Sequence, residues 1–310
     1  MLVITGATGY LGSALLDALI RKDMRVGVLG RRAPQLSQPP QSGAVEWLHA
    51  DFANPEADFL DLFEGVSTVV HCAGVAHRRA TPAEYQQVNV ISTAKLADAA
   101  SRAGVGHFIY LSSLNVVPAS AANPHEAARH LDAPSEPYAA SKWAAEQALS
   151  ACCDGSDMRL SIIRPGLVYD AELTANLRRI ASLLRRCPVL LPDVGQRSLL
   201  ARSDLVALIE GCIRGDCGQT VGQSVIAATD GECYSARRIA RAFLRGFYLP
   251  APPAWVMRTA GRALDWSSGL PPGHSWETLS TEQWCGDLPR ITGWQPQLTL
   301  ETCVNAGACQ

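Results

Sequence analysis

The stretch "VITGATGYLGSALLDAL", residues 3–19, joins a short apolar run to a segment with helical spacing through three glycines. Glycine allows a tight turn, a close approach of the backbone to a bound group, and close packing of a helix on a strand. The start of the following helix offers N–H groups and the positive end of the helix dipole. The stretch therefore predicts a strand–turn–helix unit that holds the pyrophosphate of a dinucleotide. Its candidate cofactor-binding residues are Gly6, Gly9, Tyr10, Leu11 and Gly12.

Beyond this unit, short β-rich runs alternate with longer helical patterns through the first two-thirds of the chain. Such alternation is typical of an α/β fold in which helices cover both faces of a parallel sheet. We therefore expect a Rossmann-type, doubly wound parallel sheet. The predicted strands are Leu2–Thr5, Arg25–Leu29, Val45–His49, Thr68–His71, His107–Ser112 and Leu160–Arg164.

The pattern becomes irregular after residue 165, where Pro and Gly interrupt the helical segments. We expect a dinucleotide-binding domain over residues 1–165 and a smaller, mostly helical, substrate-binding lobe over 166–310. One β-rich run, Ser224–Ala227, is a candidate to return to the first domain's sheet. The predicted helices of the lobe are Leu173–Arg186, Asp204–Ile213, Ser235–Leu244 and Trp255–Leu264.

The composition argues against some classes of binding partner. The chain has 310 residues, 18% of them charged, and a formal net charge of -2. This balance gives no electrostatic reason to expect nucleic acid or an anionic membrane as the main partner. No apolar run approaches the roughly 20 residues that span a bilayer, and no leader is expected before the first glycine motif. A cytoplasmic protein without membrane insertion is predicted.

The cysteines and histidines show no ligand spacing. Of the ten cysteines, Cys152 and Cys153 are adjacent, and no Cys-x-x-Cys pair occurs. We expect small buried residues and free thiols rather than a disulfide framework. Neither the histidines nor the acids near them form a pattern typical of a metal site. No metal is predicted.

The end of the second predicted strand bears on the choice of cofactor. An acidic residue there would accept hydrogen bonds from ribose hydroxyls and repel a 2′-phosphate. The chain instead reads "VGVLGRR", which places Arg31 and Arg32 at this point. Arginine offers donors suited to phosphate, so NADP(H) is favoured, with NAD(H) as the alternative. Asp51, followed by Phe52 in "HADF", is a candidate partner of the adenine amino group.

The segment "YAASK", residues 138–142, places Tyr138 and Lys142 one helical turn apart. Alone, such a pair is more typical of a packed tyrosine and a solvated lysine. Beside a nicotinamide, the tyrosine can exchange a proton with a substrate oxygen, and a nearby cation can lower its pKa of about 10 by roughly one to three units. Ser113, in "YLSSLNV" after the fifth predicted strand, can position that oxygen.

Together these motifs resemble the extended short-chain dehydrogenases/reductases, within the NAD-dependent epimerase/dehydratase family of nucleotide-sugar enzymes. The resemblance extends from the glycine loop to "TGWQPQLTLE" near residue 300. It implies Ser113, Tyr138 and Lys142 as the catalytic set. The further cofactor-binding residues that it implies are Cys72, Ala73 and Gly74 in "HCAG", Asn89 in "VNV", Lys142, and Pro165 in "RPGLVY".

For the substrate, the resemblance implies a nucleotide diphosphate held by Asn176 in "TANLRRI" and Arg197 in "GQRSLLARSDLV". The chain departs from the family where His-Val-Asp-Asp is common, since it has Ala201, Arg202, Ser203 and Asp204. A small-molecule nucleotide sugar is thus the expected partner. A homodimer through helices at 82–103 and 138–152 would match the family.

The resemblance implies three functions to be distinguished. The first is NADPH-dependent reduction of a 4-keto nucleotide sugar, similar to a UDP-4-keto-6-deoxy-amino sugar, in surface polysaccharide precursor synthesis. The second is an NAD-dependent nucleotide-sugar 4-epimerase. The third, a non-catalytic NADP-binding regulatory protein, has no need of the tyrosine–lysine pair. A dehydratase is disfavoured because Leu114 and Asn115 occupy the positions of the family's Asp-Glu pair.

Overall fold

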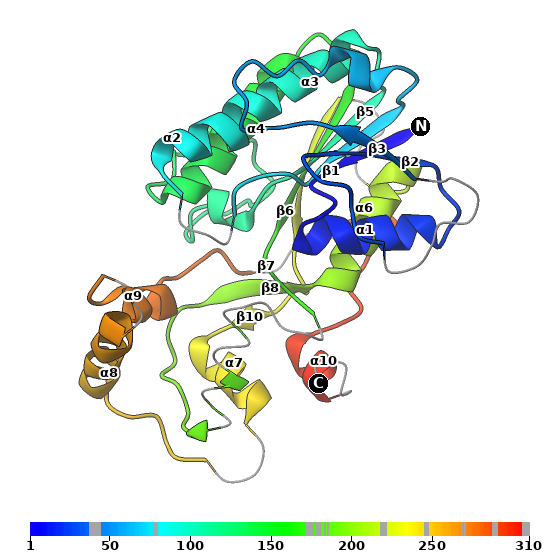
Figure 1. Ribbon diagram of the computed structural model, residues 1–310. Helices are drawn as coiled ribbons and strands as arrows, with labels where there is room; N and C mark the ends of the chain where they lie inside the picture. The colour runs from blue at the N-terminus through cyan, green and yellow to red at the C-terminus, as the bar shows by residue number, and fades with distance from the viewer. Residues whose placement is uncertain are drawn as a thin grey trace.

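A seven-stranded parallel sheet forms the centre of the molecule, with strand order β3-β2-β1-β4-β5-β6-β9 (Figure 1). The computed structural model describes residues 1–36, 45–76, 80–170, 177, 181–182, 184, 186–217, 222–244, 248–267, 269, 271–286 and 291–305. The strands are β1 (Leu2–Thr5), β2 (Val26–Gly30), β3 (Val45–His49), β4 (Thr68–His71), β5 (His107–Leu111), β6 (Arg159–Pro165) and β9 (Gln223–Ala228). The predicted Rossmann-type α/β fold is confirmed.

The apolar runs that predicted the strands are buried on both sides of the sheet. Every residue of β1 is buried, as is every residue of β6 after Arg159. A parallel sheet covered on both faces reads as a continuous apolar run, which is why these strands are visible in the sequence. The edge strand β3 differs, since Trp47 is 43% exposed.

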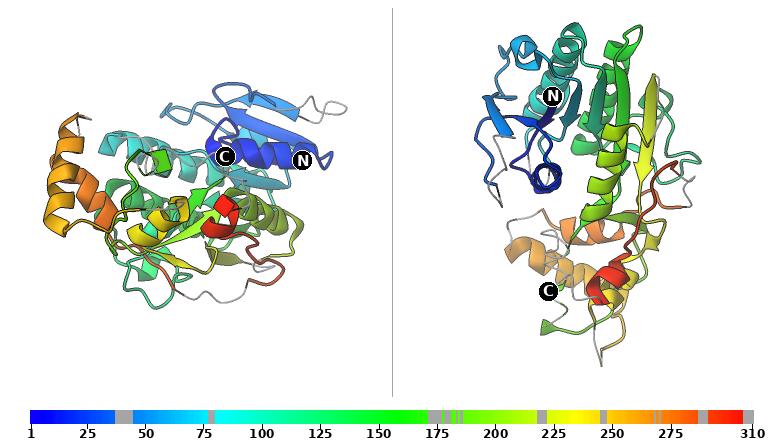
Figure 2. Two further views of the ribbon diagram at one scale, coloured as in Figure 1. Left: turned by 90° about the horizontal axis from the view of Figure 1, so that it is seen from below. Right: turned by 90° about the vertical axis from the view of Figure 1, so that its right-hand side faces the viewer.

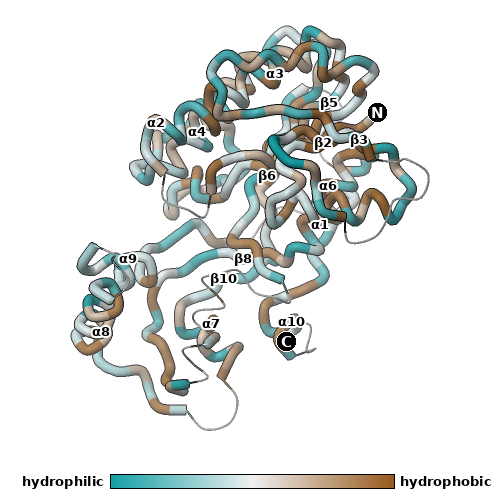
Figure 3. The backbone as a smooth tube through the Cα atoms, in the orientation of Figure 1, coloured by the Kyte–Doolittle hydropathy of each residue, from teal (hydrophilic) through white to brown (hydrophobic). Residues whose placement is uncertain are grey.

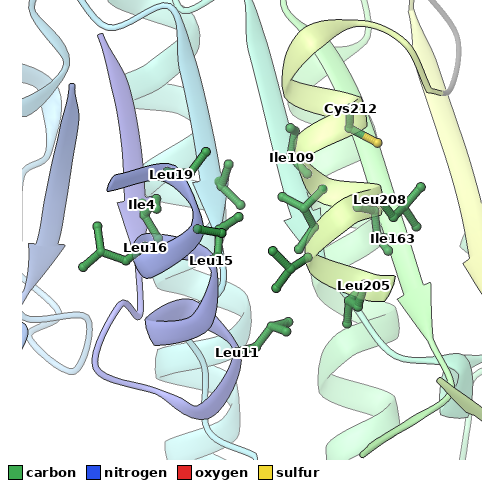
Figure 4. Close-up of a cluster of buried hydrophobic side chains, with 14 of the residues drawn as sticks. Ile4, Leu11, Leu15, Leu16, Leu19, Ile109, Ile163, Leu205, Leu208 and Cys212 are labelled. Carbon is green, nitrogen blue, oxygen red and sulfur yellow. The ribbon is translucent and has the colours of Figure 1, made fainter. Parts of the chain in front are cut away.

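Helices cover the two faces of the sheet. One face carries α1 (Tyr10–Ile20) and α6 (Arg202–Arg214), whose apolar side chains meet over the strands (Figure 4). The other face carries α3 (Ser92–Arg102) and α4 (Pro137–Cys153), which share a second apolar cluster with the sheet (Figure 2). The shorter helical elements are η2 (Leu60–Phe63), α2 (Pro82–Tyr85), η3 (Gln86–Ile91), η4 (Leu114–Val116) and η5 (Ala128–His130).

The chain after residue 165 contributes to both parts of the molecule. The predicted helix at 204–213 lies within α6, which packs beside α1 on the sheet. The predicted run at 224–227 lies within β9, which pairs in parallel with β6. The remainder forms a separate lobe below the carboxyl ends of the strands (Figure 1).

This lobe contains a small sheet as well as helices, with strand order β10-β8-β7. Tyr169, Leu199 and Tyr234, one from each strand, form its core together with Leu300. Its strands are β7 (Leu167–Tyr169), β8 (Arg197–Ala201) and β10 (Cys233–Tyr234). Its helices are α7 (Ala236–Phe243), α8 (Ala254–Ser267), α9 (His274–Ser280) and α10 (Leu300–Asn305).

A disulfide links Cys233 of β10 to Cys285, with the two Cα atoms 5.5 Å apart. The prediction of free thiols is therefore wrong for this pair. The two cysteines are 52 residues apart in the sequence and become neighbours only because the segment at 281–286 runs along β8. Gln283 N–H donates to the carbonyl of Gln196 there, at 2.8 Å. The free cysteines of the described ranges are Cys72, Cys152, Cys153, Cys187, Cys212, Cys217 and Cys303.

The part of the chain that the structure describes contains neither a membrane-spanning helix nor a metal-binding cluster. No helix in it is both long and apolar enough to pass through a bilayer. No group of three or more His, Cys, Asp or Glu side chains in it is arranged to hold a metal ion.

A fully buried ion pair joins α4 to β6. The Arg164 guanidinium donates to both carboxylate oxygens of Glu146, from Nε at 3.0 Å and from Nη2 at 2.6 Å. Arg164 Nη1 also donates to the carbonyls of Pro124 and Glu126, at 2.8 and 2.7 Å. Ser112, directly after β5, donates its hydroxyl to Glu146. The network thus connects α4, β5, β6 and the loop before α4.

Replacing one member of this pair should be far more damaging than replacing both. We expect Glu146→Leu or Arg164→Met alone to lower the free energy of unfolding by about 3–5 kcal/mol, because each leaves an uncompensated buried charge. The double variant should lose much less than the sum. Urea denaturation of the four proteins measures the coupling.

The matched control is the exposed pair Asp98–Arg102 on α3, whose charged atoms lie 3.5 Å apart. A pair of this kind contributes about 0.3–0.5 kcal/mol. Additive effects of the two single replacements would contradict the energetic coupling of Glu146 and Arg164.

Candidate active site

The glycine loop lies between β1 and α1 at the carboxyl end of the sheet. Gly6 has φ +72°, a left-handed conformation that favours glycine, and a Cβ there would lie 2.6 Å from the backbone nitrogen of Ala73. A Cβ at Gly12 would collide with the carbonyl oxygen of Gly6. The first turn of α1 has no acidic residue to neutralise the positive end of its dipole. The loop therefore fits a dinucleotide pyrophosphate.

Arg202, at the start of α6, holds this loop from the other side. Its guanidinium carbon lies 4.6 Å from the centre of the Tyr10 ring, and Nη1 donates to the Tyr10 carbonyl at 3.2 Å. Nη2 pairs with Asp170 at 2.8 Å. In the sequence, position 202 stands out only as a departure from the family's motif, and no motif marks Asp170. The departure from the common motif was the one available signal.

The adenosine end of the expected site lies at the end of β2. Arg31 and Arg32 are both exposed there, and Arg31 Nε lies 3.9 Å from a carboxylate oxygen of Asp51. The same oxygen accepts the N–H of Ala53 at 2.9 Å. The structure thus brings Arg31 and Asp51 together. Phe52 instead is buried and packs in the core.

The segment "HCAG" after β4 supplies uncharged groups. His71 is buried between the hydroxyls of Thr5 and Thr93, at 2.7 and 2.9 Å. Burial, together with the smaller effect of the Lys142 charge, lowers the pKa of His71 to about 3. Burial raises the pKa of the Cys72 thiol to about 12. Both groups are therefore neutral near pH 7 and act as packing and hydrogen-bonding groups.

Asn89 lies in the π-helical turn η3 and connects two loops. Its side-chain oxygen accepts the N–H of Val75 at 2.7 Å. Its side-chain nitrogen donates to the Val75 carbonyl at 3.1 Å and to the Ser141 hydroxyl at 2.9 Å. Asn89 thus fixes the chain after β4 to α4. A Cβ at Gly74 would lie 3.1 Å from the Asn89 oxygen, so the backbone is closely packed here.

Tyr138 lies in the first turn of α4, which Glu136 caps by accepting the N–H groups of Tyr138 and Ala139 at 3.0 and 2.7 Å. Burial raises the pKa of Tyr138 to about 12, although the nearby Ser113 side chain acts in the opposite direction. The structure therefore brings the predicted hydroxyl pair together.

Lys142 is buried one turn further along α4. Its ammonium donates to the Leu111 carbonyl at 2.8 Å and lies 4.7 Å from the centre of the Tyr110 ring. Burial lowers the pKa of Lys142 to about 8, against the opposing effects of Cys72 and Glu146. The expected lowering of the Tyr138 pKa by Lys142 is absent in the protein alone. Burial of the phenol dominates, and the ammonium is directed to Leu111.

Comparison with known proteins identifies the family. Residues 2–207 match the NAD dependent epimerase/dehydratase family. The chain belongs to this family. It is an enzyme of the extended short-chain dehydrogenase/reductase type, as its motifs predicted.

Individual members of the family differ in their activities. A UDP-glucose 4-epimerase of Vibrio cholerae is 28% identical over 320 residues, which cover 97% of this chain and 92% of that protein. A ceramide reductase of Caulobacter vibrioides is 35% identical over 202 residues, which cover 65% of this chain and 56% of that protein. Among solved structures, MoeE5 in complex with UDP-glucose and NAD has a TM-score of 0.71 at 19% identity, covering 99% of this chain and 97% of that chain.

In the smaller lobe, Arg197 begins β8 and faces the end of α9. Its Nε donates to the Gly195 carbonyl and its Nη2 to the Leu279 carbonyl, each at 3.0 Å. Burial lowers its pKa. No acidic side chain pairs with Arg197 within the described ranges. Asn176 lies outside the described residues, and Pro165 ends β6.

The loop after Ser113 is supported by Trp284, which no motif in the sequence marks. The Trp284 ring packs in one apolar cluster with Leu114 and Val117, and its Nε1 donates to the Ala121 carbonyl at 2.9 Å. Leu114 is thus a packing residue. Asn115 donates its backbone N–H to the Ser113 hydroxyl at 3.2 Å. Neither position supplies the acid and base that dehydration requires.

The buried ammonium predicts a specific pH dependence of stability. The pKa of Lys142 falls from 10.5 to about 8 on folding, so between these pH values the unfolded chain binds more protons than the folded protein. The free energy of unfolding of the wild-type protein therefore rises with pH across this window, as the buried amine loses its charge. We expect Lys142→Met to be more stable than wild type at pH 7, and the difference to shrink by roughly 3 kcal/mol towards pH 10.5.

Urea denaturation at steps from pH 7 to pH 10 measures this difference. Titration of Tyr138 is common to both proteins and cancels. Lys95→Met, which removes an exposed lysine of α3, is the control and should show no such trend. A stability difference between Lys142→Met and wild type that stays constant over the range would contradict the assignment.

Proposed function

We propose that this protein interconverts the two C4 epimers of a nucleotide sugar by reversible oxidation and reduction with bound NAD(H). The observation that carries the proposal is the proximity of the Ser113 and Tyr138 side chains, with Lys142 on the same helix, beside the glycine loop. The relative that spans 97% of the chain is a UDP-glucose 4-epimerase, which supports the choice of substrate class. The fold is shared with a structure that contains UDP-glucose and NAD, which supports the choice of cofactor.

The residues that would hold the cofactor are the loop glycines, Arg31 and Asp51 at the adenosine end, and Gly74 and Lys142 near the nicotinamide. Bound NAD supplies a hydride acceptor and, once reduced, a hydride donor. An ammonium has three N–H donors, so Lys142 can bind a ribose hydroxyl while keeping its bond to the Leu111 carbonyl. The diphosphate of the substrate is assigned to Arg197 and Asn176.

The chain's own proton chemistry centres on the phenol oxygen of Tyr138. This oxygen takes the proton of the substrate C4 hydroxyl during oxidation and returns one during reduction. Ser113 donates to the same substrate oxygen and orients it. Burial holds the Tyr138 phenol neutral in the protein alone, so its ionisation requires added positive charge. The ring of oxidised nicotinamide would supply such a charge, since the Lys142 ammonium is already present and donates to the Leu111 carbonyl.

A second candidate is NADPH-dependent reduction of a 4-keto nucleotide sugar, of the UDP-4-keto-6-deoxy-amino-sugar type, for surface polysaccharide precursors. Arg31 and Arg32, exposed at the end of β2, favour it. They stand where an acidic residue would select NAD. The similarity to a ceramide reductase also supports net reduction. A non-catalytic NADP-binding role gives no reason for the hydroxyl pair of Ser113 and Tyr138.

One assay separates these functions. The protein is purified without added nucleotide, its bound NAD is measured, and a panel of UDP sugars with 4-hydroxy or 4-keto groups is supplied with NAD or NADPH. An epimerase interconverts two 4-hydroxy sugars without net change in cofactor. A reductase consumes one NADPH for each alcohol formed. Absence of turnover on the whole panel would contradict both proposals.

Removing the phenol oxygen should abolish turnover. Tyr138→Phe keeps the ring in place but removes the proton carrier, and we expect a loss on the order of a hundred- to ten-thousandfold in kcat. Cofactor affinity should change little. Tyr85→Phe, which alters the neighbouring ring 6.3 Å away, is the matched control and should stay active. Near-normal turnover by Tyr138→Phe would disprove the assignment of the catalytic oxygen.

The arginines at the end of β2 should determine how tightly the protein binds a cofactor that carries a 2′-phosphate. We expect the double replacement Arg31→Ala with Arg32→Ala to weaken NADPH binding roughly ten- to hundredfold, because charge-assisted hydrogen bonds are lost. NADH binding should be nearly unchanged. Titration of both cofactors measures this, with Arg25→Ala at the start of β2 as control. If the double replacement weakened NADPH and NADH binding equally, the arginines would not contact the 2′-phosphate.

A further inference from the structure

Two exposed tryptophans lie on α8, which forms a hairpin with α9 at one side of the smaller lobe (Figures 1 and 2). Trp255 is 69% exposed and Trp266 is 87% exposed, both on α8. Apolar side chains scattered singly over a surface are ordinary. Two indoles on one short helix are not scattered, and hydrophobic segments are visible along α8 in Figure 3.

The two indoles share one face of the helix. Trp255, Arg262 and Trp266 are spaced by seven and four residues, which places them in line along α8. On the other side of α8, Met257 packs against the core of the lobe, while Leu264 is 51% exposed. Arg258, three residues after Trp255, lies with its guanidinium carbon 5.3 Å from the centre of the Trp276 ring. The exposed surface of α8 thus includes two indoles, two arginines and Leu264.

The charged side chains exposed on α8 are both arginines, whereas α9 carries the exposed Glu277. The single acidic residue of α8, Asp265, is fully buried and points into the hairpin. Its carboxylate accepts the N–H groups of Gly273 and Ser275, at 2.7 and 3.0 Å, and the Ser275 hydroxyl. Arg258 and Arg262 are exposed. The formal net charge of the chain is -2, so this patch differs in sign from the molecule as a whole.

The combination of indoles and arginines favours some classes of binding partner for this face over others. A second copy bound about a two-fold axis would bring the arginines of one copy against those of the other, and like charges so opposed are unfavourable. An anionic bilayer meets both requirements. Indole rings prefer the boundary between headgroups and acyl chains, and each arginine near an anionic surface adds attraction.

We propose that α8 docks this protein on an anionic membrane surface, with Trp255 and Trp266 in the headgroup region and Arg258 and Arg262 against the lipid phosphates. The helix would lie along the surface and not cross it. The hairpin is joined to the substrate side of the protein, because the Leu279 carbonyl accepts a hydrogen bond from Arg197. Docking would therefore turn the substrate lobe towards the bilayer.

Sedimentation of the full-length protein with vesicles tests the proposal. The vesicles contain either phosphatidylcholine alone or equal parts of phosphatidylcholine and phosphatidylglycerol. We expect binding to the anionic vesicles only, with a blue shift of tryptophan emission and a loss of binding at high salt. The double replacement Arg258→Gln with Arg262→Gln should weaken binding about fivefold for each arginine. Trp255→Ala with Trp266→Ala should abolish the emission shift.

Matched controls come from the opposite end of the molecule. Trp47→Ala and Arg102→Gln remove an exposed tryptophan and an exposed arginine outside the hairpin and should leave vesicle binding unchanged. The proposal is overturned if wild type remains in the supernatant with anionic vesicles, or if the controls lose binding as strongly as the α8 variants. It is also overturned if wild type self-associates and the tryptophan variant does not, since the face would then bind a second copy.

Discussion

The buried contact between Glu146 and Arg164 is the interaction on which the arrangement of the site depends. Glu146 lies one turn beyond Lys142 on α4, and it accepts a hydrogen bond from Ser112, the neighbour of Ser113. One carboxylate therefore fixes α4 relative to the end of β5. Buried ion pairs add little net stability, because desolvation offsets their attraction. Their value here is geometric, since any other alignment of α4 would leave a charge buried without a partner.

The site around this pair is poor in charge. Burial shifts the pKa values of His71, Cys72, Tyr138 and Lys142 towards their neutral forms, each in the direction that desolvation requires. A ligand that brings charge into such surroundings should shift the pKa values of these groups strongly, because few mobile dipoles screen its charge. The protonation of the tyrosine and the lysine is consequently coupled to what is bound.

Much of the fold was readable from the sequence, and for a local reason. The six predicted strands of the large sheet lie within a residue or two of the observed ones, because each is an apolar run buried on both faces. The glycine loop and the segment at 138–142 were readable because their spacing is short. Ser113 followed from its place after a predicted strand, and the structure brings it to Tyr138.

The features that escaped prediction all depend on distant contacts. Arg202 meets Tyr10 across 192 positions of sequence, and Cys233 meets Cys285 across 52. The strand at 233–234 is too short to produce a periodic pattern. The helix at 202–214 was expected in the substrate lobe, but its apolar face packs beside α1, which no pattern within the helix reveals.

The crowding at Gly6 has a consequence for how mutational scans of this loop are to be interpreted. The space that a side chain at position 6 would need is already filled by the backbone of Ala73, which follows a different strand. Any substitution must push the two loops apart before a nucleotide arrives. Loss of activity at this position therefore reports a steric conflict between two parts of the protein. It would occur even if the residue made no contact with the cofactor.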